Sequence, residues 1–187
     1  MKILLQPLGS LDTSVLKYVA SGLREVYSNI EFHVSSKPLQ LPEVFYDRKR
    51  GQYVSPLIVE YLRRWVEDTR CIHDKVLGIM DADAYTPGLN FVFGEAELGG
   101  KTAVIYLARL KPSFYGTSAS QRVFLERCLK EAVHELGHTL GLKHCATPRC
   151  VMRFSNSIYD TDFKSYYFCP RCTEVLWNLG IQAKSFK

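Results

Sequence analysis

A short histidine-rich segment constrains this 187-residue chain more than any other feature: His134-Glu-Leu-Gly-His-Thr-Leu-Gly-Leu-Lys-His144. On a helix, His134 and His138 are four residues apart, so their rings project from the same face. Gly141 follows three residues later, where a glycine can take a left-handed conformation and end the helix. The chain can then turn back and bring His144 to the other two. The spacing therefore predicts a metal site.

Three imidazoles suit zinc, and three protein ligands leave the fourth tetrahedral position open to water, as catalytic zinc sites do. We therefore predict a catalytic zinc held by His134, His138 and His144. Zinc lowers the pKa of its bound water toward roughly 7 and polarises a substrate carbonyl. Glu135 can reach that water without binding the metal, and it would act as the general base. A surface helix with chance histidines is the alternative, which the glycine and third histidine at fixed spacing disfavour.

The six cysteines predict a second metal site. Four of them crowd the C-terminal quarter: Cys145, Cys150, Cys169 and Cys172. They form two closely spaced pairs, Cys145-x4-Cys150 and Cys169-x2-Cys172, as is typical of a closed tetrahedral zinc site. We therefore predict a structural zinc there. A redox pair at the CxxC, or cysteines that only pack in the core, are the alternatives. Cys71 and Cys128 have no partner spacing and are expected to be small buried hydrophobes.

Residues 134–172 resemble the metzincins, zinc peptidases in which HExxHxxGxxH precedes a methionine turn. Cys145, Cys150, Met152 and the Cys169-Pro-Arg-Cys172 pair make the segment more narrowly similar to the archaemetzincins. The resemblance implies peptide-bond hydrolysis, with Met152 as an apolar base beneath the histidines. It also implies that the strand before Gly99-Gly100 forms the cleft edge that pairs with an extended substrate.

One position departs from the metzincin pattern. Some metzincins place a tyrosine two residues after the methionine, where it stabilises the oxyanion, but this chain has Phe154. Tyr159, Tyr166 and Tyr167 lie close in sequence, and the resemblance gives none of them a role. What stabilises the oxyanion besides zinc is therefore open.

The two predicted metal sites are adjacent in the sequence. His144 and Cys145 are neighbours, so their Cα atoms lie about 3.8 Å apart. Cys150 comes two residues before Met152. Our hypothesis is that the structural zinc fixes this segment and thereby orients the catalytic zinc.

Hydrophobic patterns ahead of the motif predict an α/β (α+β) chain. Strands are expected at residues 2–6, 30–35, 75–80, 89–98 and 102–107, the last two joined by a two-residue hairpin at Gly99-Gly100. Helices are expected at residues 12–27, 55–70, 118–140 and 173–179. The long helix opens on a Ser118–Gln121 capping box, Gly180 follows the last helix, and residues 37–51 read as a loop. Together with the resemblance, this predicts a mixed twisted sheet with one antiparallel edge strand, a long active-site helix and a zinc-stapled C-terminal subdomain.

Length and composition fit a single domain over residues 1–187. We assign residues 1–117 to the sheet and its supporting helices, 118–144 to the active-site helix and third ligand, and 145–187 to the methionine turn and cysteine segment. With 47% hydrophobic residues the chain is not of the disordered class. Neither an 18-residue apolar run nor a signal peptide is recognisable, so a cytoplasmic, membrane-free monomer is expected.

Three functions compete on these residues. A zinc peptidase with two zinc ions, acting on peptides or proteins, ranks first. A peptide-binding module with a catalytically silent metal site ranks second. Nucleic-acid binding through the four cysteines ranks third, because the net charge of +5 is spread along the chain and few basic residues surround Cys169. Whether a peptidase would act inside chains or at N-termini is left open.

Overall fold

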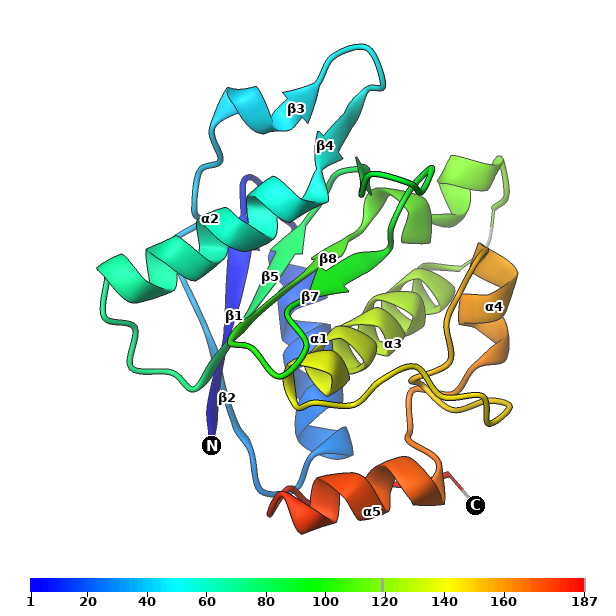
Figure 1. Ribbon diagram of the computed structural model, residues 1–187. Helices are drawn as coiled ribbons and strands as arrows, with labels where there is room; N and C mark the ends of the chain where they lie inside the picture. Colours follow the sequence, from blue (N-terminus) through cyan, green and yellow to red (C-terminus); the bar gives the residue numbers. More distant parts are fainter. Residues whose placement is uncertain (119, 187) are drawn as a thin grey trace.

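A five-stranded sheet with apolar side chains on both faces forms the centre of the computed structural model, which describes residues 1–118 and 120–186 (Figure 1). Its strands, in spatial order, are β2 (Glu31–Val34), β1 (Lys2–Leu8), β5 (Lys75–Met80), β8 (Thr102–Tyr106) and β7 (Gly94–Ala96). The first four run parallel, while β7 pairs antiparallel with β8 at one edge. The predicted mixed sheet with one antiparallel edge strand is confirmed.

The sheet separates two apolar cores because successive side chains on a strand face opposite sides. Ile3 and Leu5 of β1 belong to the core under helices α1 (Thr13–Val26) and α3 (Gln121–Thr139). Leu4 and Leu8 belong to the core under α2 (Ser55–Asp68), on the other face. Parallel strands covered on both sides read as nearly continuous apolar runs, which is why β1 and β5 were predictable.

Helix α3 begins later than the sequence suggested. Gln121 is its first residue and Ser120 its N-cap, which makes no side-chain capping bond, so the predicted capping box from Ser118 to Gln121 is wrong; Ala119 lies outside the described residues. Upstream, the amide and the hydroxyl of Thr117 both donate to the carbonyl of Pro112. The chain is therefore still held in the preceding turn when it reaches residue 118.

The hairpin between β7 and β8 has a four-residue loop, residues 98–101, instead of the predicted two-residue turn. The Glu97 amide donates to the Thr102 carbonyl, and the Thr102 hydroxyl donates to the Glu97 carboxylate at 2.6 Å. The loop is also tied to the long helix, because the Gly99 amide donates to the carbonyl of His138 at 2.9 Å. Contact with α3, which the sequence does not reveal, thus sets the loop conformation.

The predicted loop over residues 37–51 is only partly irregular. A 3-10 helix at Glu43–Phe45 leads into β3 (Tyr46–Asp47), which pairs antiparallel with β4 (Gln52–Val54). Strand β4 also pairs with β6 (Ala84–Tyr85), completing a small second sheet. The basic residues 48–50 occupy the exposed turn of this hairpin.

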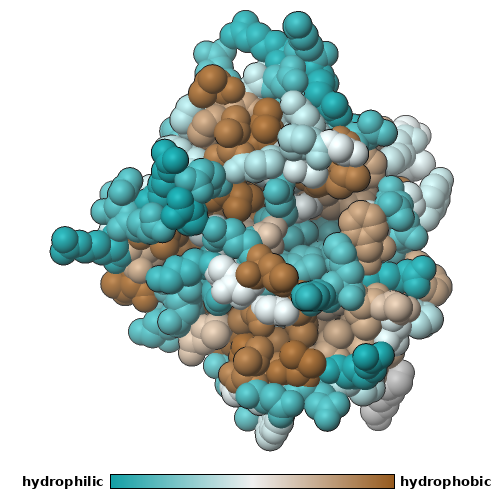
Figure 2. All heavy atoms as spheres, viewed as in Figure 1, coloured by the Kyte–Doolittle hydropathy of each residue, from teal (hydrophilic) through white to brown (hydrophobic). Residues whose placement is uncertain are grey.

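Two short helices lie in the C-terminal region. α4 (Ile158–Phe163) falls in a stretch expected to be irregular. α5 (Pro170–Asn178) starts three residues earlier than predicted, inside the CxxC pair, and Gly180 follows it at φ 76°. None of the helices in the described part is long and apolar enough to cross a membrane. The face seen in Figure 2 is mainly hydrophilic, with apolar side chains gathered in several separate patches.

Candidate active site

Helix α3 presents His134 and His138 on one face, with their Nε2 atoms 3.1 Å apart. His134 Nδ1 lies 2.7 Å from the carbonyl oxygen of Val151, and His138 Nδ1 lies 2.8 Å from that of Leu142. A carbonyl oxygen can only accept a hydrogen bond, so each Nδ1 carries the ring hydrogen. The Nε2 lone pairs of both rings are therefore free and face the same space.

The turn after α3 brings His144 to this pair. Gly141 has φ 91°. Its amide donates to the backbone carbonyl of His138, and the Leu142 amide donates to the backbone carbonyl of Gly137. These two bonds form a Schellman motif, which ends the helix and reverses the chain as the glycine spacing indicated. The His144 ring centroid lies 4.8 Å from that of His138, and one nitrogen of each histidine lies within 4.8 Å of the others.

His134 and His138 fit zinc in the distance between their Nε2 atoms, and all three histidines fit it in protonation state. Zinc–nitrogen bonds of about 2.0–2.1 Å in a tetrahedron place ligand nitrogens about 3.3 Å apart, close to the 3.1 Å observed. Burial lowers the pKa of His134 well below its usual value and also lowers the pKa values of His138 and His144. Neutral imidazole is the form that binds a metal.

Glu135 lies beside the histidines, wedged between α3 and strand β7. Only 5% of it is exposed, and burial raises the pKa of its carboxyl well above the usual value. A Cβ atom on Gly94 would lie 2.5 Å from Glu135 Cγ and 2.6 Å from Oε1. A glycine at position 94 is therefore what makes room for this carboxylate.

A cleft of about 750 Å³ opens over these residues. One wall comes from β7 and the segment before it, including Phe91 and Phe93, and the other from residues 154–156. The Phe154 ring lies 4.9 Å from that of His144. Among the described residues, none of those lining the cleft is a tyrosine.

Met152 is fully buried against α3. A Cβ atom on Gly137 would collide with the Met152 sulfur, so the glycine lets the methionine lie directly on the helix backbone. Gly137 comes three residues after His134, within one helical turn. The methionine thus packs under the helix segment that carries the histidines.

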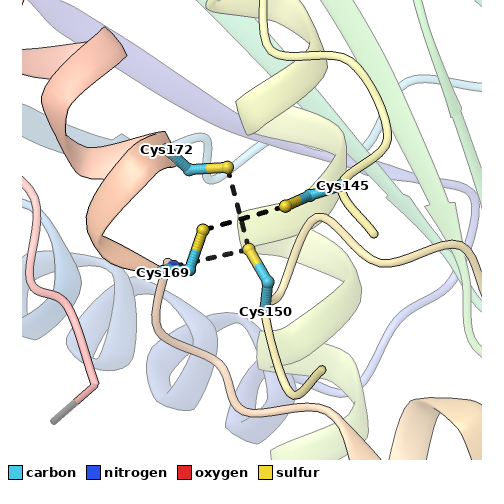
Figure 3. A group of neighbouring side chains, drawn as sticks. All are labelled: Cys145, Cys150, Cys169 and Cys172. Atoms are coloured by element: carbon cyan, nitrogen blue, oxygen red, sulfur yellow. Dashed lines mark hydrogen bonds between the residues drawn. The ribbon is translucent and has the colours of Figure 1, made fainter. Parts of the chain in front are cut away.

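The four predicted cysteines converge between α5 and the segment after α3 (Figure 3). Cys145 Sγ lies 3.7 Å from Cys169 Sγ, and Cys150 Sγ lies 3.8 Å from Cys172 Sγ. These separations are far above a disulfide length of about 2.05 Å. Zinc–sulfur bonds of about 2.3 Å would place tetrahedral thiolates about 3.8 Å apart, so the donor set fits a closed zinc site.

Three consecutive residues link the two clusters. Cys150 belongs to the cysteine cluster, the Val151 carbonyl accepts from His134, and Met152 packs on Gly137. The Val151 amide in turn donates to the carbonyl of Tyr167, two residues before Cys169. The backbone that orients a histidine is therefore anchored on both sides by the cysteine cluster.

Known proteins are similar to this chain over nearly its full length. Residues 3–178 match the model of Peptidase family M54. The archaemetzincin of Methanocaldococcus jannaschii is 44% identical over 181 residues, covering 97% of this chain and 96% of that protein. The chain belongs to the archaemetzincins. It is a zinc metallopeptidase.

Solved archaemetzincin structures share the fold. The crystal structure from Methanopyrus kandleri superposes with a TM-score of 0.81 at 37% identity, covering 96% of each chain. The one from Archaeoglobus fulgidus, complexed with malonate, gives 0.77 at 40% identity and covers 94% of this chain and 99% of that one. Family and fold class, both predicted from residues 134–172 and the element order, are confirmed.

Sequence reasoning missed the buried charges along α3 of this archaemetzincin. Glu131 is 2% exposed, and its carboxylate lies 3.0 Å from the Lys164 ammonium. Arg127 donates two hydrogen bonds of 2.7 Å to Asp162. The polar face of α3 is covered because α4 lies against it. A signal for α4 was present, since Ser157 and Asp160 have the spacing of a capping box, and the structure shows that box formed.

Proposed function

We propose that this archaemetzincin hydrolyses peptide bonds with a catalytic zinc held by His134, His138 and His144 and with Glu135 as the general base. Three neutral imidazoles converging beside a buried carboxylate in a cleft are the observation that carries this proposal. When bound there, zinc lowers the pKa of a coordinated water toward roughly 7 and polarises the substrate carbonyl. The chain itself supplies the proton transfers and the positioning.

Glu135 takes the proton of the attacking water and delivers it to the leaving amine. Gly94 and β7 confine the carboxylate on one side, so it stays next to the histidines instead of turning toward solvent. The carbonyls of Val151 and Leu142 hold the imidazoles by their Nδ1–H groups. Such outer hydrogen bonds fix the orientation of ligands and raise their basicity.

The substrate is a peptide or protein segment in extended form. Within the described part of the chain, strand β7 is an edge strand that pairs with β8 alone in the sheet, and it lines the cleft. An extended peptide can add to that free edge by main-chain hydrogen bonds. Phe91 offers apolar surface on the same wall, with the buried ring of Phe93 packed against it.

A second zinc is held by Cys145, Cys150, Cys169 and Cys172, giving two zinc ions per chain. The separations between the sulfur atoms support a structural role, as does the presence of four protein ligands, which would fill all positions of a tetrahedral zinc. Through Val151, this zinc would fix the carbonyl that orients His134.

Turnover of a peptide library by the zinc-loaded protein tests the proposal. Glu135→Gln keeps the shape of the side chain but removes the base, so turnover should fall by about 10²–10⁴-fold, with both zinc ions still bound. Glu126→Gln, at an exposed ion pair with Arg122 on the same helix, is the matched control and should leave turnover unchanged. Wild-type protein with both zinc ions and no turnover of any peptide would instead identify a silent peptide-binding module.

A further inference from the structure

Four side chains form a line at the edge of the sheet opposite β7. His33 lies on the edge strand β2, and Cys71 and His73 lie between α2 and β5. His33 Nε2 is 2.6 Å from Glu31 Oε1, and His33 Nδ1 is 2.8 Å from His73 Nε2. His73 Nδ1 is 3.5 Å from Cys71 Sγ. A carboxylate, two imidazoles and a thiol are thus connected in series.

One assignment of the histidine tautomers gives the hydrogen bonds in this line a single direction. The hydrogen bond from His33 lowers the pKa of Glu31, so its carboxylate is ionised and can only accept, and His33 Nε2 donates. In the tautomer that carries its hydrogen on Nε2, His33 has an acceptor at Nδ1, toward which His73 Nε2 donates. His73 is left with an unprotonated Nδ1 facing Cys71. The pKa of His73 is lowered mainly by burial and, to a smaller extent, by the neighbouring His33, and this favours the neutral form of His73.

The end of α2 fixes Cys71 in this position. Arg70 adopts a left-handed conformation with φ 48°, and its amide donates to the backbone carbonyl of Glu67. The Cys71 amide donates to the carbonyl of Val66 at 3.0 Å, which completes a Schellman motif. Cys71 is half-buried, and Ile72 beside it is 81% exposed, so a small molecule can approach this turn.

Cys71 differs from the five other cysteines. Four belong to the cysteine cluster, where bound zinc would occupy their thiolates. Cys128 is fully buried, and burial raises the pKa of its thiol. Cys71 alone combines partial exposure with a neighbouring base.

We propose that Cys71 is an activated thiol, a site of covalent modification by low-molecular-weight disulfides, with His73 as its general base. His33 and Glu31 are positioning residues, because they hold the His73 ring with Nδ1 toward the sulfur. The reagent must be small, since Cys71 is only partly exposed.

The reaction is a thiol–disulfide exchange. The Cys71 S–H proton moves to His73 Nδ1, and the resulting thiolate attacks one sulfur of the disulfide. A new S–S bond forms to Cys71 while the S–S bond of the reagent breaks. The leaving thiolate then takes the proton from His73 Nδ1 and departs as a free thiol.

The same residues could be considered as a metal site, but their arrangement disfavours it. Cys71 and His33 contact opposite ring nitrogens of His73. Ligands of one ion converge on a point, whereas these atoms are connected in series through the His73 ring.

Reaction of the zinc-loaded protein with 5,5′-dithiobis(2-nitrobenzoate) at pH 7 tests the proposal. We expect one fast-reacting thiol per chain, absent in Cys71→Ser. His73→Gln can still donate a hydrogen bond but cannot act as a base, so the rate should fall at least about tenfold. Cys128→Ala is the matched control and should keep the fast thiol. Peptidase turnover and unfolding temperature report that each variant is folded.

Two results would overturn this assignment. One is a fast thiol that persists in Cys71→Ser or that reacts equally fast in folded His73→Gln. The other is a third equivalent of zinc in the wild-type protein that is lost in both His33→Gln and His73→Gln, which would establish a metal site in place of the relay.

Discussion

The histidine cluster and the cysteine cluster occupy neighbouring parts of the chain, yet they differ in number of ligands and in access. His144 is exposed and His138 half-buried, and both line a cleft. Three of the four cysteines are buried, and none of the four lines that cleft. Three ligands leave a tetrahedral zinc one free position, whereas four leave none. The first arrangement suits turnover of a substrate, and the second suits holding the backbone.

The cysteine cluster, which is closed, can also support the histidine cluster, which is open to the cleft. The chain between them contributes Cys150 to one cluster and the Val151 carbonyl to the other. A carbonyl hydrogen-bonded to a ligating imidazole influences metal affinity as an outer ligand does. Experiments should therefore be able to remove metal from one cluster at a time, but loss of the cysteine site should also affect metal binding at the histidine site.

Removal of metal should distinguish the two sites most clearly, because it should cause the largest loss of turnover. A chelator should take zinc first from the histidine cluster, because this site is open to the cleft. Turnover should then fall by about a thousandfold or more, since the metal supplies several kcal/mol of transition-state stabilisation. Zinc analysis, turnover and circular dichroism on the same samples provide the check. Simultaneous loss of both zinc ions with unfolding would show that the sites do not differ in this way.

Cys169→Ala/Cys172→Ala should break the closed site and weaken the open one. We expect loss of the second zinc, a lower unfolding temperature, and zinc affinity at the histidines reduced about 10–100-fold, as for loss of an outer ligand. Competition with a chromophoric chelator measures that affinity. Cys128→Ala, which removes a buried thiol outside both clusters, is the control. Unchanged affinity in a folded double variant would refute the link through Val151.

Local spacing made much of both sites predictable. His134, His138, Gly141 and the cysteine pair of α5 lie within one helix or turn, where sequence distance determines spatial distance. The apolar runs of β1 and β5 were predictable for a similar reason, because each strand is buried on both faces.

Contacts between distant segments were not predictable. Nothing near Gly94 in the sequence indicates that it faces Glu135, and Lys164 lies 33 positions from its partner Glu131. The pairing of His33 with His73 likewise depends on the edge strand β2 lying next to the segment that leads from α2 into β5. The capping-box pattern illustrates the limit, since the one at Ser118 is absent while the one at Ser157 is formed.

Gly94→Ala should impair the open site and leave the closed site intact. The added methyl group would overlap Glu135 and displace its carboxylate, and a misplacement of about 1 Å can cost about 100-fold in rate. We expect kcat to fall about 10–100-fold with both zinc ions retained. Gly22→Ala is matched, because its Cβ would overlap the buried Leu129 side chain away from the cleft. That variant should lower stability by about 1–3 kcal/mol with little change in kcat.

Met152→Leu should have the smallest effect and should test what the methionine contributes between the two sites. Leucine has a similar volume, so we expect a loss below about 1.5 kcal/mol in unfolding free energy and only a few-fold change in kcat. Met80→Leu, buried in the core on the α2 side of the sheet, is the matched control. Denaturant unfolding and turnover measure both variants. If Met152→Leu lost far more activity than stability while Met80→Leu lost neither, the sulfur itself would act on the histidine site. Equal, small losses would show that Met152 supports the site by packing on Gly137 alone.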